Sequence, residues 1–168
     1  MTVTNESAGL RAPLAQIRAA EPSDYAAMVK LCDGAKVFTA TELDSALQDF
    51  AACDSALGDR LVVHQQGEGA LQGFIQYSPA PITDGSWYIY WIAVAKQAQG
   101  AGIGATLLAY AEADLRSIRA RQILIETSAK PAYDAARSFY LGRGYHQIAR
   151  IPDYYTHGDD KCVFLKKL

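Results

Sequence analysis

The amino-acid sequence predicts a single mixed α/β domain, and three observations support this prediction. The 168 residues match the length of one ordinary domain. Half of the residues are apolar and a fifth are charged, which is typical of globular proteins. Runs of strand type alternate along the chain with stretches of helical spacing. We therefore expect one layered structure with a mixed sheet and helices on both of its faces.

The N-terminal third is predicted to hold a leader, a strand and two helices. Residues 1–12 are polar and small, without the apolar core of a signal peptide, so we expect a disordered leader and a single domain over residues 13–168. Alternating apolar positions predict a strand at Leu14–Ala20. Helical spacing then predicts one helix that ends near Cys32 and another that begins near Thr39 or Thr41. We expect these two helices to act as a lid more than as part of the core.

Further elements follow in a regular order. The run Tyr88–Val94 is apolar, rich in aromatic and branched residues and too short for a buried helix, so it predicts a strand. Pro, Asp and Gly recur at Ile151–Asp160, and we expect a loop there. The remaining predicted elements are strands 60–66 and 71–78 with a turn at 67–69, a helix from residue 103, strand 122–127, helix 132–141, and strands 145–150 and 161–167.

Composition argues against several classes of protein. The formal net charge of −2 gives no electrostatic case for binding nucleic acid or an anionic membrane. No apolar run approaches the ~20 residues that span a bilayer. The cysteines show no CxxC pairing and no nearby histidine cluster, which disfavours a metal site or a disulfide framework. Reduced thiols are the default, and we expect a cytoplasmic protein.

The loop at residues 99–105 is the candidate anion site. Gly100, Gly102 and Gly104 fall within five positions, after a predicted strand and before a predicted helix. Such a unit directs backbone N–H groups and the positive end of a helix dipole at an anion. A plain turn would need one glycine, not three. We therefore predict that this loop holds a phosphate-bearing cofactor.

A dinucleotide-binding fold is the main alternative. The pattern Gly100-x-Gly102-x-x-Ala105 satisfies its loose fingerprint, and Glu126 ends the next strand where a ribose-binding carboxylate would stand. Two features count against it. Residues 95–99 separate the strand from the first glycine, and only about 40 residues follow Thr127, too few for the further parallel strands.

Three segments resemble the GNAT superfamily of acetyl-CoA-dependent N-acetyltransferases. The family's pyrophosphate-loop pattern, Gln/Arg-x-x-Gly-x-Gly/Ala, is matched by Gln99-x-x-Gly102-x-Gly104. The run Trp91-Ile92-Ala93-Val94 is similar to the family's central strand, and Ala136-x-x-Phe139-Tyr140-x-x-x-Gly144-Tyr145 is similar to its downstream helix and following strand. The resemblance implies a single-domain GNAT fold, with about seven strands and a splay between the two central parallel strands.

The resemblance also implies a donor and a reaction. Acetyl-CoA would supply the acetyl group, a primary amine would attack it directly, and no metal would take part. The main chain of Ile92, Ala93 and Val94 would bind the acetyl and pantetheine arm. The pyrophosphate would be bound by Gln99, Gly100, Ala101, Gly102, Ile103, Gly104 and Ala105.

Two residues are candidates for proton transfer. Tyr140 matches the family's general acid for the leaving thiolate, and the alternative is a tyrosine that merely packs on the sheet. Transfer from a phenol of pKa ~10 to a thiolate of pKa ~8.5 is mildly uphill, so such an acid must be well placed. Glu126 is our candidate base, acting through water, and a structural hydrogen-bonding role is equally open. The base is in doubt because Tyr88–Val94 carries no carboxylate.

The acceptor is the least legible feature of the sequence. Asp153, Tyr154 and Tyr155 belong to a segment that resembles the acceptor-side connection of the family, and they either line an amine pocket or simply build a turn. Small amines, amino acids, antibiotics, protein N-termini and lysines all remain open as acceptors, and so does a homodimer. The absent strand carboxylate leaves a second function open, an acyl-CoA-binding or regulatory module without catalysis.

Overall fold

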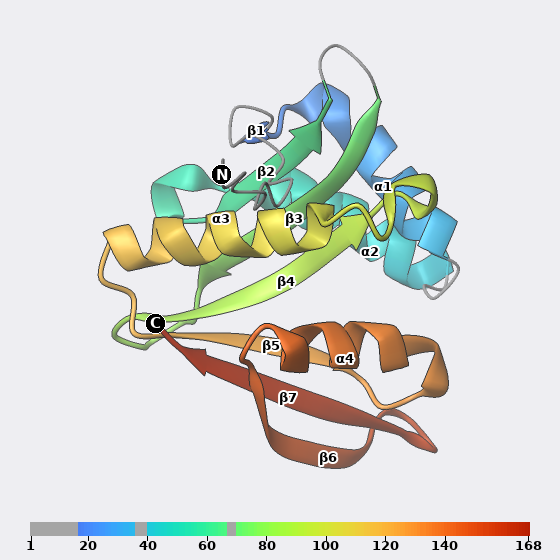
Figure 1. Ribbon diagram of the computed structural model, residues 1–168, viewed down its shortest axis with the longest axis vertical. Helices are drawn as coiled ribbons and strands as arrows, with labels where there is room; N and C mark the ends of the chain where they lie inside the picture. Colours follow the sequence, from blue (N-terminus) through green and yellow to red (C-terminus); the bar gives the residue numbers. More distant parts are fainter. Residues whose placement is uncertain (1–16, 36–39, 67–69) are drawn as a thin grey trace, which may run out of the picture.

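The computed structural model describes residues 17–35, 40–66 and 70–168, which form a seven-stranded mixed sheet with helices on both faces (Figure 1). The strands lie in the order β1-β2-β3-β4-β5-β7-β6. Their bounds are β1 (Ile17–Ala19), β2 (Arg60–Gln65), β3 (Leu71–Pro79), β4 (Ser86–Val94), β5 (Gln122–Ser128), β6 (His146–Thr156) and β7 (Asp159–Lys167). The helices are α1 (Tyr25–Ala35), α2 (Ala40–Ala52), α3 (Ile103–Ser117) and α4 (Asp134–Gly142). The predicted fold class is confirmed.

The two central strands are the part of the sheet that matters most for function. β4 and β5 pair in parallel, whereas the other neighbouring strands pair antiparallel, which rules out the parallel sheet of a dinucleotide fold. The β4–β5 ladder ends at the pair Ile89 and Ile125. β4 nevertheless continues to Val94 and β5 to Ser128. The two strands therefore separate beyond this pair, as the predicted splay requires.

A β-bulge on β4 lies where the separation begins. Gln76 of β3 pairs with Trp91, but the next residue, Tyr77, pairs with Ile89, so Tyr90 is the extra residue on β4. A bulge bends its strand and re-aims side chains. The bulge at Tyr90 directly follows Ile89, the last residue of β4 that pairs with β5.

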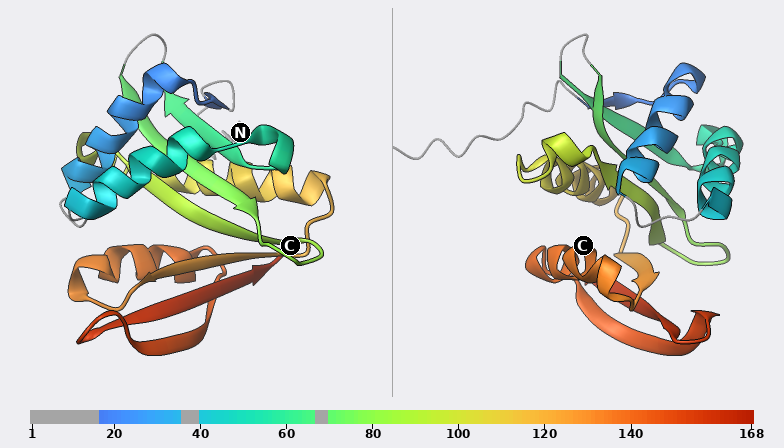
Figure 2. Two further views of the ribbon diagram at one scale, coloured as in Figure 1. Left: turned by 180° about the vertical axis from the view of Figure 1, so that it is seen from behind. Right: turned by 90° about the vertical axis from the view of Figure 1, so that its right-hand side faces the viewer.

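Apolar clusters fill both faces of the sheet. α3 and α4 cover one face and α1 and α2 the other, as the right-hand view of Figure 2 shows. Residues of α3 such as Leu107 and Leu108 pack with Ile123 and Ile125 of β5 in the first cluster. The second cluster contains fully buried side chains from both N-terminal helices, Met28, Cys32, Ala46 and Phe50. The expectation that these helices form a lid is wrong, because the apolar residues four positions apart on each helix make one buried stripe.

The predicted loop at Ile151–Asp160 is also wrong. β6 extends to Thr156 and β7 begins at Asp159, so a two-residue turn joins the two strands. Asp153 has a φ of 50°, and the β6–β7 register shifts between Ile151 and Thr156. The carboxylate of Asp160 accepts hydrogen bonds from the Asp153 N–H at 3.0 Å and from Arg150 Nε at 2.6 Å. Polar residues that are typical of a loop here hold an irregular strand in place.

Some predicted features lie outside the described residues. These are the leader at residues 1–12, the first part of strand 14–20 and the turn at residues 67–69. The other predicted elements are present, with boundaries shifted by a few residues. In the part of the chain that the structure describes, no helix is long and apolar enough to cross a membrane.

Candidate functional site

The glycine loop joins the end of β4 to the start of α3. Gly100 and Gly102 both have a φ of 83°, a left-handed conformation that favours glycine. A Cβ atom at either position would meet nothing within 4 Å, so both residues face open space. Gly102 is the N-cap of α3 and no side chain caps the helix. The N–H groups of the first turn, beginning with Ile103, therefore lack an intrahelical acceptor and favour an anion.

The third glycine has different surroundings. A Cβ on Gly104 would lie 3.5 Å from a methyl group of Val94 and 3.6 Å from the ring of Phe139. These are ordinary contact distances, so Gly104 lies where α3 meets β4 and α4, and a small side chain would also fit there. Gln99 is exposed, and its Nε2 donates to the carbonyl of Val94 at 3.3 Å, a contact that links the loop to the end of β4.

The backbone predicted to bind the acetyl arm lies at the open side of β4. Ile92, Ala93 and Val94 pair with β3 on one side, where their partners are Ile75, Phe74 and Gly73. On the other side they lie beyond the end of the β4–β5 ladder. Main-chain groups in such a gap are available to a ligand that enters between the strands.

A groove of about 310 Å³ lies between α3 and α4, lined by Ala105, Leu108, Ala109, Glu112, Gly142, Arg143 and Lys166. The groove starts beside the glycine loop at Ala105 and extends along α3. Lys166 Nζ donates to both Glu112 oxygens and to the carbonyl of Arg143, each at 2.8 Å. The charge of Lys166 is therefore already paired with Glu112. The guanidinium of Arg143 is exposed and lies 5.6 Å from the Phe139 ring centre. Sequence reasoning missed Arg143, since no motif singles out an arginine at the end of a helix.

Tyr140 lies on α4 and is 6% exposed. Its ring packs against Tyr145 and Phe164, with centroid distances of 6.3 and 5.8 Å. Burial raises the pKa of the Tyr140 phenol to about 12. The hydroxyl therefore stays protonated at neutral pH and retains a proton to donate.

Glu126 is the first residue of β5 beyond the part of the strand that pairs with β4. Ile123 and Ile125 point into the α3–α4 cluster, so alternation directs Glu126 to the opposite face. Its Oε2 accepts a hydrogen bond at 2.8 Å from the ammonium of Lys161 on β7. The two proposed proton-transfer residues, Tyr140 and Glu126, thus lie on opposite faces of the sheet.

The structure separates the three predicted acceptor residues. Tyr154 and Tyr155 pack edge to face with ring centres 5.0 Å apart. Burial, followed by the charge of Glu126, raises the pKa of Tyr155 to about 12. Asp153 instead builds the turn, because its carboxylate accepts a hydrogen bond from the Gly158 N–H.

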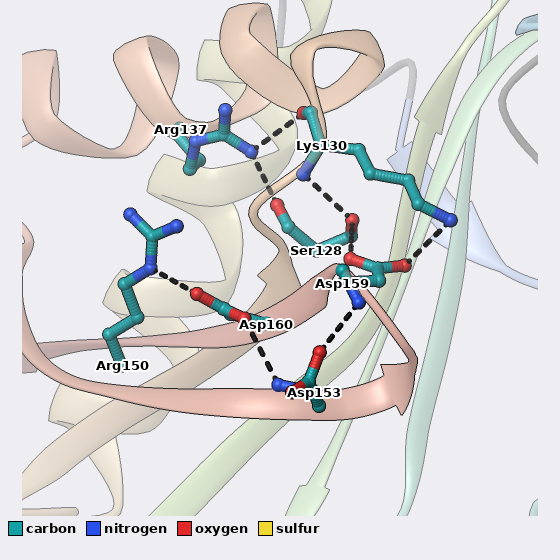
Figure 3. Close-up of polar contacts among 8 residues, drawn as sticks. Ser128, Lys130, Arg137, Arg150, Asp153, Asp159 and Asp160 are labelled. Carbon is teal, nitrogen blue, oxygen red and sulfur yellow. Dashed lines mark hydrogen bonds and ion pairs between the residues drawn. The ribbon is translucent and has the colours of Figure 1, made fainter.

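A polar network fixes the β6–β7 hairpin to the end of β5 (Figure 3). The Ser128 hydroxyl donates to Asp159 at 2.5 Å, and the ammonium of Lys130 lies 3.2 Å from the same carboxylate, which is 6% exposed. Arg137 of α4 donates to the carbonyl groups of Ser128 and Lys130. The hairpin that carries Tyr154, Tyr155 and Lys161 is thereby held in a fixed position beside the opening. We call the surface formed by Glu126, Lys161, Tyr154 and Tyr155 the acceptor face, after the role that the sequence predicts for Tyr154 and Tyr155.

Comparisons with known proteins agree with this geometry. A family model described as the acetyltransferase (GNAT) domain matches residues 57–147, more than half of the chain. A solved GNAT-family protein from Desulfovibrio desulfuricans is 30% identical, with a TM-score of 0.83 over 90% of this chain and 97% of that one. An uncharacterized N-acetyltransferase from Methanocaldococcus jannaschii is 33% identical over 84 residues, which span 49% of this chain and 53% of that relative. The chain thus aligns with only about half the length of this curated relative.

More distant solved structures share the fold. The yncA protein from Salmonella typhimurium, solved with its cofactor acetyl-CoA, has a TM-score of 0.71 and 20% identity over 90% of this chain and 92% of that one. The ribosomal-protein-S18-alanine N-acetyltransferase from Escherichia coli has a TM-score of 0.73 and 19% identity over the same shares of the two chains. The open central strands and glycine loop, the family-model match and the Desulfovibrio relative lead to one conclusion: the chain belongs to the GNAT family of acetyltransferases.

Proposed function

We propose that the protein is an N-acetyltransferase that moves an acetyl group from acetyl-CoA to a primary amine by direct attack, without a covalent enzyme intermediate. The observation that carries this proposal is the opening between β4 and β5, which lies directly beside the uncapped N-terminus of α3. One site thus combines free main-chain groups for an acyl arm with an anion cradle for a pyrophosphate.

The residues on the α3–α4 face fit acetyl-CoA, which would supply an activated thioester there. Open space above Gly100 and Gly102 lets the backbone close on phosphate oxygens. The groove between α3 and α4 continues from this loop and offers the guanidinium of Arg143 to a further anionic group. Two solved structures of the same fold support this donor, one with acetyl-CoA and an aminoglycoside 6'-N-acetyltransferase with coenzyme A.

Two side chains would move the protons. The Tyr140 hydroxyl would donate a proton to the departing thiolate; its raised pKa makes this transfer more uphill than from a free phenol, so the hydroxyl must be well placed beside the sulfur. Glu126 would accept the proton of the amine through water from the other face. An alkylamine of pKa ~10.4 is mostly charged at pH 7, so this proton must leave before attack. Proton donation to the thiolate and proton removal from the amine would therefore take place from opposite faces of the sheet.

The acceptor would reach the opening from the acceptor face. Among the described residues, no helix covers this side of β5, β7 and β6 (Figure 2). The open surface suits a small amine or an amine of a protein chain, and one fold relative acts on a ribosomal-protein alanine. A cytoplasmic location, suggested by the free thiols of Cys32, Cys53 and Cys162, stays a prediction, as does a homodimer.

Release of free CoA from acetyl-CoA, measured with a thiol reagent across a panel of amines, tests the proposal. The panel should contain a diamine, an aminoglycoside, free amino acids, a peptide with an N-terminal alanine and a lysine peptide. We expect turnover with at least one acceptor and mass-spectrometric detection of its acetyl amide. Tight acetyl-CoA binding without turnover of any amine would contradict it and favour an acyl-CoA-binding module.

A further inference from the structure

Lys161 places a buried positive charge on the acceptor face. The residue is 7% exposed, and its Nζ lies 2.8 Å from Glu126 Oε2 and 3.7 Å from the ring centre of Tyr154. Burial lowers the pKa of this ammonium, but hydrogen bonds to Glu126 and Tyr154 outweigh the burial and raise the pKa above its ordinary value. Lys161 therefore stays charged at neutral pH.

The position of this ammonium relative to the opening follows from the strand register. Lys161 of β7 pairs with Ser128 and Val163 pairs with Glu126, so Lys161 and Glu126 are diagonal neighbours on one face. Both therefore lie beside the part of β5 that has separated from β4. An amine that enters the opening from this face meets a joined pair of opposite charges, not a lone carboxylate.

A lone carboxylate would hinder this chemistry. A negative charge near an ammonium favours the charged form and raises its pKa, so Glu126 alone would bind the acceptor but hold its proton in place. A nearby positive charge has the opposite effect. Because Lys161 offsets the charge of Glu126, the pair leaves a carboxylate oxygen for hydrogen bonding without stabilising the ammonium form.

The other charged groups around this pair have partners of their own. Asp159 is paired with Lys130, and Asp160 with Arg150. The remaining titratable groups that face the pair or the bulge on β4 are Tyr88 and Tyr90 on β4, Tyr154 and Tyr155 on β6, Asp49 on α2 and Asp59 before β2. Burial raises the pKa of both Tyr90 and Tyr155, so these phenols stay neutral. Lys161 is thus the cation in direct contact with Glu126.

We propose that Lys161 is a positioning residue of the acceptor site, whose fixed charge orients Glu126 and favours the neutral, nucleophilic form of the incoming amine. This inference rests on the proposed function and adds an answer to a question that the sequence left open. β4 offers tyrosine and tryptophan, with no carboxylate, at its opening. A site that lowers the pKa of the bound amine can remove its proton with a weaker base.

The test is the pH dependence of kcat for the best amine of the panel, compared between wild type and Lys161→Met. Loss of the positive charge should raise the apparent pKa of the bound amine by about one unit, which lowers kcat at pH 7 about tenfold. The acceptor KM should stay equal or fall, because the ammonium now meets an uncompensated carboxylate. Lys161→Arg keeps the charge and should keep the wild-type profile.

Glu126→Gln should shift the apparent pKa of the bound amine in the opposite direction, because it leaves the positive charge of Lys161 without its negative partner. It should lower the apparent pKa and raise the acceptor KM. A purely structural role for Lys161 would give no such pair of opposite shifts. Acetyl-CoA affinity and the melting temperature serve as checks on folding, and Lys161→Gln replaces Lys161→Met if the latter unfolds.

Two failures are distinguishable. This inference would be overturned, and the proposed function would stand, if wild type turns over and the pH profile of Lys161→Met is unshifted. The same holds if the pH profiles of Lys161→Met and Glu126→Gln shift in the same direction. Absence of turnover by wild type with every amine would overturn both.

Discussion

In the proposed mechanism, the two faces of the sheet bind the two substrates through different parts of the chain. On the α3–α4 face, the groups offered to the donor are mostly main chain, at β4 beyond its ladder and at the first turn of α3. On the acceptor face, the groups offered are side chains, above all Glu126 and Lys161. A donor that is the same in every family member can be bound by a backbone shape that stays the same. A surface of side chains can instead differ from one member to the next, as the acceptor differs. The donor site is therefore legible in a sequence, and the acceptor site is not.

Tyr140→Phe should give the largest effect and tests whether the donor face also performs chemistry. Removing the hydroxyl should lower kcat about 100-fold, the low end for a general acid, while acetyl-CoA affinity stays unchanged. Steady-state rates and calorimetric titration of acetyl-CoA separate the two quantities.

Tyr145→Phe is a matched control for this change. Tyr145 is also buried, and its ring packs against that of Tyr140, so the control removes a phenol hydroxyl from the same cluster. Its removal should leave kcat unchanged. Equal rates for wild type and Tyr140→Phe would show that Tyr140 only packs against the sheet.

Gly102→Val should weaken the donor side alone. A β-branched residue at a φ of 83° costs about 2 kcal/mol in backbone strain, and the loop can relieve it only by leaving the shape that suits a phosphate. The Kd for acetyl-CoA should rise about 30-fold, with little change in the acceptor KM at saturating donor.

Gly158→Val is the control for Gly102→Val. Gly158 has a φ of 79° and lies in the turn between β6 and β7, and a Cβ there meets nothing within 4 Å, so the same substitution adds similar backbone strain away from the donor groove. This variant should bind acetyl-CoA like wild type. Equal donor affinity in Gly102→Val would remove the loop from the binding site.

Much of the fold could be predicted from the sequence, and so could the segments that form the proposed donor site, because glycines at fixed spacing, an apolar strand and a helical stripe are local signals. The acceptor face could not. The pairing of Glu126 with Lys161 joins residues 35 positions apart, and it depends on β5 and β7 being neighbours. The β6–β7 hairpin was missed for a different reason. Hydrogen bonds of the Asp153 and Asp160 carboxylates to backbone N–H groups five and seven positions away hold a strand that Pro152 and Gly158 would otherwise disfavour.

Asp159→Asn should give the smallest effect and confine it to the acceptor side. Asp159 is buried, accepts from Ser128 and pairs with Lys130, so its neutralisation should cost about 1–2 kcal/mol of stability. A looser hairpin should raise the acceptor KM a few-fold without changing acetyl-CoA affinity. Chemical denaturation and steady-state kinetics measure the two effects.

Asp134→Asn is the matched control for this prediction. Asp134 pairs with Arg137 through a carboxylate whose side chain is 70% exposed, and surface pairs contribute little. Its stability should stay within about 0.5 kcal/mol of wild type. A change in donor affinity in Asp159→Asn would contradict the division between the two faces.

A crystal structure of the protein with acetyl-CoA tests the central claim most directly. We predict density for the pyrophosphate against the N–H groups of residues 100–105, and for the thioester between Ile92–Val94 and the separated end of β5. The Tyr140 hydroxyl should face the sulfur from the α4 side, and Glu126 should face the carbonyl carbon from the acceptor face. Acetyl-CoA bound elsewhere, with the β4–β5 opening filled by protein side chains, would contradict the account.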